Sequence, residues 1–329
     1  MNSQRLFALA WRTIPRLPGA LTRGIFDLVA LLAHTVRIAG VRQLERNIAR
    51  LRPDLQGRSL RRTSRRGMRT YMRYYGEVFA LRSLRPEQID ARVRAVGDEA
   101  VRSQFADGSV IAALGHAGNW DLAGAWCGRA LARVLTVAEV LEPRELFEEF
   151  LAFRAELGMD VLGLEAGGGV FRELLKKSRR HPYLVPLLAD RDLSSSGVQV
   201  QAGGHPVRIA AGPAALALAT GRPLVQIFIR HERLRGQRRR RAGSPWGIVL
   251  EFTPVHLPDG VGHEDRVQAL SQAWFDVFAA KVRRHPEHWH MLQKVFVADL
   301  DADRLARAAH RRKGKDLQEL IDESRAGED

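Results

Sequence analysis

The chain has 329 residues, of which 45% are hydrophobic, enough for a sizeable core in one large or two ordinary domains. Its formal net charge of +15 favours anionic partners such as acidic lipid headgroups, polyphosphate cofactors or nucleic acid. The single cysteine, Cys127, excludes an internal disulfide and a cysteine-based zinc site. Its apolar neighbours predict a packed rather than a reactive thiol, and the composition is that expected of a cytosolic chain.

Residues 1–50 are predicted to be helical, with apolar side chains mixed among arginines. The longest apolar stretch, 25–36, is interrupted by Asp27 and His34 and is shorter than the roughly 20 residues of a spanning helix. The segment also lacks the small-residue cleavage site of a secretory signal. This pattern is typical of helices lying on an anionic membrane surface. An amphipathic segment docked on the protein's own core is the alternative.

Further along the chain, a basic helix is predicted over 58–82, and short apolar runs alternate with amphipathic segments from residue 109 onward. The predicted strands are 110–114, 134–138, 160–164, 184–188, 223–230 and 247–252. The predicted helices are 120–132, 143–157, 169–179, 211–220 and 264–284. This alternation predicts an α/β fold with helices on the faces of a sheet. The basic run 238–241 is expected in a long hairpin loop, and the charged tail after residue 300 is expected to be helical or frayed.

The most informative segment joins the apolar run 110–114 to a glycine, His116 and, five residues later, Asp121. Histidine suits general-base work near neutral pH, and a carboxylate can hold its ring in one tautomer. On an ideal helix, residues five apart lie about 140° apart around the axis. We therefore expect a strand, a turn and then a helix capped by Asn119. In the alternative interpretation, Asp121 only begins a helix and His116 is a loop histidine.

A second candidate site element follows the apolar strand 183–188, which ends in Asp190, Arg191 and Asp192. Side chains at the carboxyl ends of strands line the ligand crevice of open α/β folds, so Asp190 is predicted to approach His116. Asp121 and Asp190 thus compete as partners of the histidine. A local ion-pair cluster at the strand end is the alternative role for the three charged residues.

The segment His116 to Asp121 resembles the His-x4-Asp/Glu motif of the lipid A late-acyltransferase superfamily, within it the branch that acylates phosphatidylinositol mannosides. The resemblance covers roughly residues 5–300. Other segments agree in order: 24–27, 46–50, 153–158, 188–193, 208, 211–214, 285–286 and 289–293. The resemblance implies a single α/β acyltransferase domain over 1–300 with a mostly seven-stranded sheet and a hydrophobic groove. Within it, 1–50 would be membrane-associating helices, and 301–329 would be a charged tail.

The same resemblance implies that His116 is the general base, oriented by Asp190 with help from Asp121. The family usually has glutamate at the position of Asp190, so this chain is one methylene shorter there.

Three further residues are assigned to substrate binding. Arg154 matches an arginine of the family and is expected to contact the substrate or acyl thioester; a salt bridge to Glu148 or Glu149 is the alternative. Ser196 is expected to contact the cosubstrate, unless it only forms a turn. Arg208, which precedes a Gly-Pro helix start, also resembles a family arginine.

The implied reaction transfers a fatty acyl group from acyl-CoA, a palmitoyl-CoA-like cosubstrate, to a mannose hydroxyl of a phosphatidylinositol mannoside. No permanently bound cofactor is expected. A metal is not expected either: on a helix His285 and His288 would share a face but His290 would not, and Pro286 disrupts a simple helix there. The expected location is peripheral, at the cytoplasmic face of the plasma membrane, with an anionic membrane surface and a membrane glycolipid as partners.

Two alternatives remain at this point. One is the same chemistry on a lysophospholipid or lipid A-type acceptor. The other is a non-catalytic basic protein that binds membranes or nucleic acid; the scattered arginines and the lack of a nucleic-acid motif disfavour nucleic acid as a partner. The sequence sets no oligomeric state.

Overall fold

The computed structural model describes residues 13–140, 144–164, 169–192 and 197–300. Its helices are α2 (Gly19–Thr35), α3 (Ala39–Leu51), α4 (Gly57–Leu81), α5 (Pro86–Arg92), α6 (Glu99–Arg102), α7 (Trp120–Ala130), α8 (Arg144–Glu156), α9 (Val170–Arg180), α10 (Gly212–Thr220), α11 (Gly236–Ala242) and α12 (Arg266–Arg284). Its strands are β1 (Val93–Val96), β2 (Val110–Leu114), β3 (Val134–Glu139), β4 (Met159–Leu164), β5 (Leu184–Leu188), β6 (Val198–Ala202), β7 (His205–Ile209), β8 (Leu224–Arg233) and β9 (Trp246–Val255).

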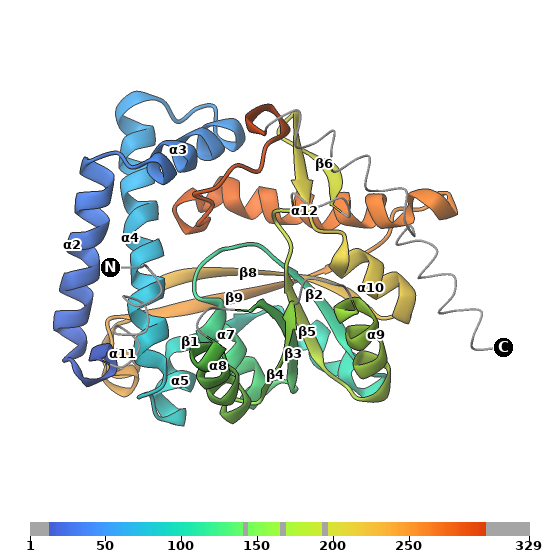
Figure 1. Cartoon of the computed structure of the whole chain (residues 1–329), viewed down its shortest axis with the longest axis horizontal. Helices are drawn as coiled ribbons and strands as arrows, with labels where there is room; N and C mark the ends of the chain where they lie inside the picture. Colours follow the sequence, from blue (N-terminus) through green and yellow to red (C-terminus); the bar gives the residue numbers. More distant parts are fainter. Residues whose placement is uncertain (1–12, 141–143, 165–168, 193–196, 301–329) are drawn as a thin grey trace.

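Seven strands form one mixed sheet in the order β1-β9-β8-β2-β5-β3-β4 (Figure 1). Only β8 and β9 pair antiparallel; the other neighbours are parallel. Alternate residues of β2 enter two different cores, one built with α4, α5, α7 and α8 and the other with α9, α10 and α12. Because both faces are covered, the central strands β2 and β5 are apolar along their whole length.

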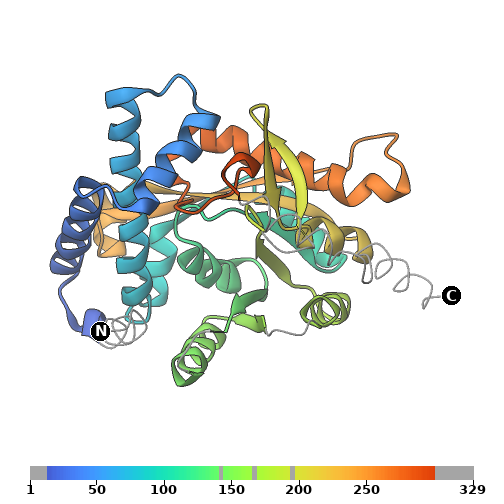
Figure 2. The ribbon, with the colours of Figure 1, turned by 45° about the horizontal axis from the view of Figure 1, so that its top comes forward.

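Helices α2, α3 and α4 gather at one end of the molecule, beside the β1–β9 edge (Figures 1 and 2). α2 and α3 pack on α4, and their shared core includes Ala30, Leu44 and Met68. No single helix of the described chain is long and apolar enough to cross a membrane. α2 and α3, which meet at 80°, would pass that test by length and composition only as a bent pair.

The predicted α/β class, the single domain and the seven-stranded sheet are confirmed. All six predicted strands and five predicted helices of the α/β part are present within a few residues of their expected ends, and so is the basic helix, as α4. Cys127 is buried as predicted, and burial raises the pKa of its thiol to about 12.

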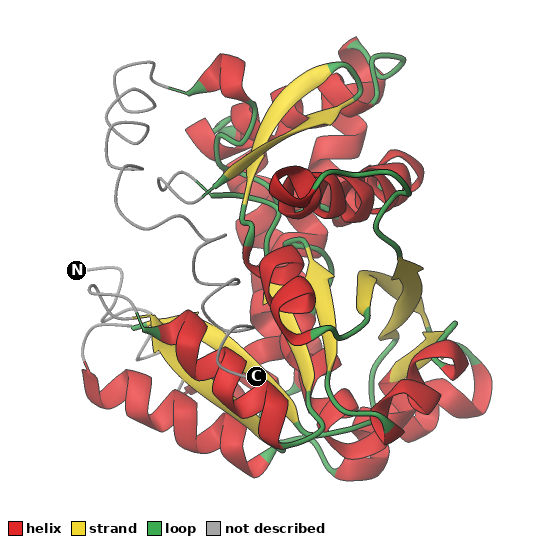
Figure 3. Cartoon of the chain, turned by 90° about the vertical axis from the view of Figure 1, so that its right-hand side faces the viewer, coloured by secondary structure: helices red, strands yellow, loops and turns green. Residues whose placement is uncertain are grey.

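Two expectations about the fold were wrong or incomplete. The run 238–241 does lie in the connection of a hairpin, between antiparallel β8 and β9, but this connection forms a short helix, α11. α11 packs on α5 and so gains tertiary support. The sequence interpretation also missed β1 and the separate β6–β7 hairpin, which packs on α12 (Figure 3). The predicted tail, 301–329, lies outside the described residues.

Candidate active site

His116 and Asp190 meet because each stands two residues beyond the end of a neighbouring parallel strand. Leu114, the last residue of β2, is paired with Leu188, the last residue of β5. The N–H of Ala189 donates to the carbonyl of Leu114 at 2.8 Å, so the two strands stay in register as they leave the sheet. The sequence argument from strand ends therefore places both side chains correctly.

The two side chains are joined by a hydrogen bond of 2.6 Å between Nδ1 of His116 and Oδ1 of Asp190. The backbone N–H of His116 donates to Oδ2 of the same carboxylate at 3.0 Å, and the indole N–H of Trp289 donates to that oxygen at 2.8 Å. The side chain of Asp190 is 0% exposed, whereas that of His116 is 38% exposed. The carboxylate thus lies behind an imidazole that reaches the surface.

Asp190 stays ionised in this environment. Burial by itself would raise the pKa of the carboxyl, but the charge of His116 and three hydrogen-bond donors outweigh burial and hold the pKa below its usual value. An ionised carboxylate can only accept, so Nδ1 of His116 carries the proton in their hydrogen bond. In the neutral imidazole the lone pair is then on Nε2.

Two glycines shape the loop that carries His116. A Cβ at Gly115 would collide with the ring of Phe278, and Gly118 has a φ of 62° with Ile229 pressed against it. The segment 288–290 holds the loop from the other side: the N–H of residue 290 donates to the carbonyl of His116 at 2.7 Å. The position of the imidazole is therefore fixed by backbone contacts as well as by Asp190.

Asn119 connects this loop to helix α4. Its side-chain oxygen caps α7 by accepting the N–H of Leu122 at 2.9 Å, as the sequence predicts. Its amide also donates to Oε2 of Glu77 at 2.9 Å, and the same oxygen accepts from His231 at 3.2 Å. Burial would raise the pKa of Glu77, but His231 and Asn119 hold it below its usual value. The sequence interpretation did not single out Glu77.

Asp121 has partners other than those predicted. Its Oδ1 accepts from the guanidinium of Arg154 at 2.6 and 3.2 Å, and its Oδ2 accepts from the hydroxyl of Tyr74 at 2.9 Å. Both oxygens are thus engaged by α8 and α4, and Nδ1 of the imidazole is hydrogen-bonded to Asp190 instead. Arg154 is held in this buried ion pair, with its guanidinium 4.7 Å from the ring centre of Phe150.

Replacing Asp121 with alanine is expected to lower the free energy of unfolding by about 3–5 kcal/mol, because it leaves the buried charge of Arg154 without its carboxylate. The double variant Asp121→Ala with Arg154→Met should recover part of that loss, since no charge is then stranded. Chemical denaturation measures both. Glu148→Ala, which removes an exposed partner of Arg144, is the control and should change stability by less than about 1 kcal/mol. Equal losses in the single and double variants would contradict this account.

The remaining predicted residues lie near the end of β5 and in the β6–β7 hairpin. Arg208 donates from Nη2 to the carbonyl of Gly197 at 2.8 Å. Arg191 donates to the carbonyl of Lys294 at 3.1 Å, while the carboxylate of Asp190 is hydrogen-bonded to His116 and Trp289. Ser196 lies outside the described residues.

In the described part of the chain, no group of three or more His, Cys, Asp or Glu side chains is placed to hold a metal ion, and this includes the histidines at 285, 288 and 290. His288 and His290 are buried. Burial, followed by the neighbouring positive groups, lowers the pKa of both well below the usual value. The two rings are thus neutral packing elements around the loop of His116.

These two histidines predict acid sensitivity. Their folded-state pKa values are depressed, so below about pH 6.5 the unfolded chain binds protons that the folded chain does not. Above about pH 6.5 these two histidines should leave the free energy of unfolding independent of pH. Below that pH it should fall, by up to about 1.4 kcal/mol per pH unit for each histidine. Urea unfolding between pH 7.5 and 5.5 measures the slope. His290→Gln should reduce the slope, and a change at exposed His263 should not.

A buried carboxylate behind a surface-reaching imidazole, at the carboxyl edge of an α/β sheet, is an arrangement suited to general-base chemistry. Comparison with known proteins identifies the family to which this chain belongs. A family model described as bacterial lipid A biosynthesis acyltransferase matches residues 3–297. The chain belongs to this family and is an acyltransferase.

Two relatives are more specific. The phosphatidylinositol mannoside acyltransferase of Mycolicibacterium smegmatis is 33% identical over 302 residues, covering 92% of this chain and 93% of the relative. The protein of the same name from Mycobacterium tuberculosis strain H37Rv is 33% identical over 311 residues, covering 93% of this chain and 92% of the relative. This chain is similar to both over nearly its whole length.

Proposed function

We propose that this protein transfers a fatty acyl group from an acyl-CoA, of the palmitoyl-CoA type, to a mannose hydroxyl of a phosphatidylinositol mannoside. The observation that carries the proposal is the 2.6 Å hydrogen bond between His116 and buried Asp190, just beyond the carboxyl ends of the parallel strands β2 and β5. Membership of an acyltransferase family and the names of two full-length relatives support the same reaction.

In this mechanism Nε2 of His116 accepts the proton of the acceptor hydroxyl while Asp190 keeps Nδ1 protonated. The hydroxyl oxygen attacks the thioester carbonyl and forms a tetrahedral intermediate. The intermediate collapses by breaking the carbon–sulfur bond, and the imidazolium returns its proton to the departing CoA sulfur. An ester and CoA-SH result, and the histidine is neutral again. Asp190 orients the ring and stabilises its charge; Asp121 and Arg154 act as positioning residues for α7, which follows the loop.

The acyl chain is proposed to lie along the carboxyl edge of the sheet, in the hydrophobic groove that the resemblance implies. Leu188 ends β5 next to the site, and Leu164 ends β4 further along the same edge. Both are large apolar side chains that are exposed in the described structure. An acyl chain covering them would gain roughly 25 cal/mol for each Å² of apolar surface removed from water.

We also propose that α2 lies on the cytoplasmic face of the plasma membrane. One face of α2 exposes large apolar side chains to solvent: Leu21, Ile25, Leu28, Val29, Leu31 and Leu32. Burial in an interfacial layer would cover this face, and the net charge of +15 favours an anionic surface. In such a position the edge of the sheet that carries His116 would lie close to the membrane surface that holds the acceptor lipid.

A lipid A-type acceptor is the second candidate, favoured by the description of the matching family model. Purified protein with palmitoyl-CoA and each of three acceptors separates the possibilities: a phosphatidylinositol mannoside, a lysophospholipid and a lipid A precursor. CoA release is followed with a thiol reagent and the acylated lipid by mass spectrometry. Acylation of the mannoside far above the other acceptors is expected. Preferred acylation of another acceptor would overturn the acceptor assignment, and no transfer to any of them would overturn the reaction.

A further inference from the structure

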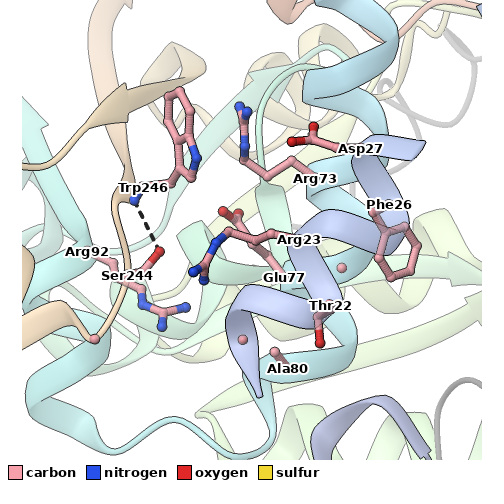
Figure 4. Close-up of a pocket in the computed structure, with 13 residues that line it drawn as sticks. Thr22, Arg23, Phe26, Asp27, Arg73, Glu77, Ala80, Arg92, Ser244 and Trp246 are labelled. Carbon is pink, nitrogen blue, oxygen red and sulfur yellow. Dashed lines mark hydrogen bonds between the residues drawn. The ribbon is translucent and has the colours of Figure 1, made fainter. Parts of the chain in front are cut away.

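A pocket whose lining does not include His116 lies between the N-terminal helices and the start of β9 (Figure 4). Its walls come from α2, α4, the end of α5 and the segment 243–246. It holds about 590 Å³ of empty space, including the solvent at its mouth. No step of the mechanism above uses it.

Three arginines from three different helices line this pocket: Arg23 of α2, Arg73 of α4 and Arg92 of α5. Arg92 is 8% exposed and is held by a 3.0 Å hydrogen bond from Nε to the carbonyl of Ala242. The guanidinium of Arg73 lies 3.6 Å from the ring centre of Trp246. Figure 4 shows the guanidinium groups of Arg23 and Arg92 pointing toward the same space beside Ser244.

Two acidic side chains of the lining, Glu77 and Asp27, have hydrogen-bond partners outside it. Glu77 accepts hydrogen bonds from Asn119 and His231 through one oxygen. Asp27 forms a two-contact ion pair with Arg69, at 3.0 and 3.1 Å, and Arg69 is not part of the lining. Both carboxylates also act on the lining arginines, Glu77 on Arg73 and Arg92, and Asp27 on Arg73. Three arginines against two carboxylates still leave the lining with a net positive charge.

The charge of Arg92 is only partly compensated inside the protein. Burial is the largest effect and lowers the pKa of its guanidinium; the charge of Glu77 opposes burial, and the like charge of Arg23 adds to it by a smaller amount. A further anion in the pocket would stabilise this partly desolvated cation. Guanidinium groups suit phosphate in particular, because their fixed fork of N–H donors matches two phosphate oxygens.

We propose that this pocket binds the phosphodiester of a lipid headgroup; the lipid assignment rests on the proposed function. The position of the pocket selects a lipid over a soluble anion. Thr22, Arg23 and Phe26 line it from one side of α2, and by helical spacing the exposed Leu21, Ile25 and Leu28 lie on the opposite side.

The expected level of the pocket relative to the bilayer also fits a headgroup. A helix with its side chains is about 10–12 Å across, and an interfacial helix buries its apolar face about 5–10 Å into the headgroup and acyl boundary. The opposite side of α2 would then stand at the level of the headgroup phosphates. A phosphodiester held there by Arg23 and Arg92 leaves the sugar part of the lipid outside the pocket.

The pocket is also one contact away from the catalytic loop. Glu77 lines the pocket and accepts a hydrogen bond from the side chain of Asn119. Asn119 follows His116 by three residues and caps α7. Binding of a headgroup phosphate would therefore bring the acceptor lipid next to the loop that carries the general base, without placing the phosphate at the reacting atoms.

The test is binding of dioctanoyl phosphatidylinositol, a short-chain lipid with one phosphodiester, to the full chain by isothermal titration calorimetry. Arg23→Gln should raise the Kd about tenfold or more, the effect expected for loss of a charge-assisted hydrogen bond. Arg133→Gln is the matched control: it removes the same charge from an exposed arginine paired with Asp160, near the β3–β4 edge, and should change the Kd less than twofold. Arg92→Gln is the second variant, and thermal unfolding checks that each variant is folded.

Two further ligands identify the source of the anion. Dioctanoylglycerol has the chains without the phosphate and should bind at least tenfold more weakly. Inorganic phosphate has the charge without the chains and should compete only at much higher concentration. An unchanged Kd in folded Arg23→Gln and Arg92→Gln variants would overturn the site. Equal binding of inorganic phosphate and of the lipid would overturn the lipid assignment.

Kinetics separate this proposal from the proposed function. In Arg23→Gln the KM for the glycolipid acceptor should rise, while kcat and the KM for palmitoyl-CoA stay within about twofold. Arginine-dependent lipid binding by a wild-type protein that transfers no acyl group would support the pocket and overturn the function. Full acyl transfer by wild type and Arg23→Gln, with equal acceptor KM and equal lipid Kd, would overturn the pocket alone.

Discussion

The His116→Ala variant is expected to have a kcat at least about 10²–10⁴-fold lower than that of the wild type, because it lacks the group that we propose takes the proton from the acceptor hydroxyl. Folding should persist. The replaced side chain is 38% exposed, and Asp190 keeps two donors, the backbone N–H of residue 116 and the indole of Trp289. The measurement is the steady-state rate of CoA release with saturating palmitoyl-CoA and glycolipid acceptor.

A second variant separates the loss of the base from the loss of a contact. In His116→Asn the amide nitrogen can take the place of Nδ1 and donate to Asp190, but no group remains where Nε2 stood. We expect it to be as inactive as His116→Ala and closer to wild type in thermal stability. A His116→Asn protein with kcat within tenfold of wild type would show that another group accepts the proton.

The pairing of His116 with Asp190 was predictable because its cause is local. Two apolar runs of five residues mark β2 and β5, and each places a titratable residue two positions past its end. Parallel strands carry such residues to one edge whatever the rest of the chain does. The family resemblance added the choice of His116 over the other histidines, which composition and spacing do not give.

The role of Asp121 was not predictable in the same way. Its place in the first turn of α7 follows from sequence, and that part was correct. Its partners, Arg154 and Tyr74, come from helices that are distant in the chain, and their contacts depend on how α4 and α8 pack. The choice between Asp121 and Asp190 as the hydrogen-bond partner of the imidazole was therefore decided by tertiary packing.

Three features that were missed or given no role did leave signals in the sequence. The β6–β7 hairpin alternates apolar and polar residues over 198–202 and has a Gly203-Gly204 turn, a strong hairpin pattern. Glu77 is the only acidic residue in the arginine-rich helix α4, and a lone acid in such a helix is a candidate for a specific contact. Trp289 lies in a segment that matches the family, and its indole N–H, if buried, needs an acceptor, which here is Asp190.

The Asp190→Asn variant is expected to lower kcat by about 10³–10⁴-fold with little change in the thermal unfolding midpoint. Asparagine has nearly the shape of aspartate, and its oxygen can still accept from the indole of Trp289 and from the backbone N–H of residue 116. Its amide nitrogen, however, would face Nδ1 of His116 as a donor. The favoured tautomer then carries its proton on Nε2, where the mechanism needs a lone pair.

The contrast with Asp121→Asn makes this prediction specific. That change weakens the ion pair with buried Arg154, so it should lower the unfolding midpoint, whereas Asp190→Asn should lower kcat while the midpoint holds. Thermal unfolding and kcat measured on both variants give four values that distinguish the two carboxylates. If Asp190→Asn were as unstable as Asp121→Asn and lost no more activity, Asp190 would serve the fold, and the tautomer argument for its role beside His116 would fail.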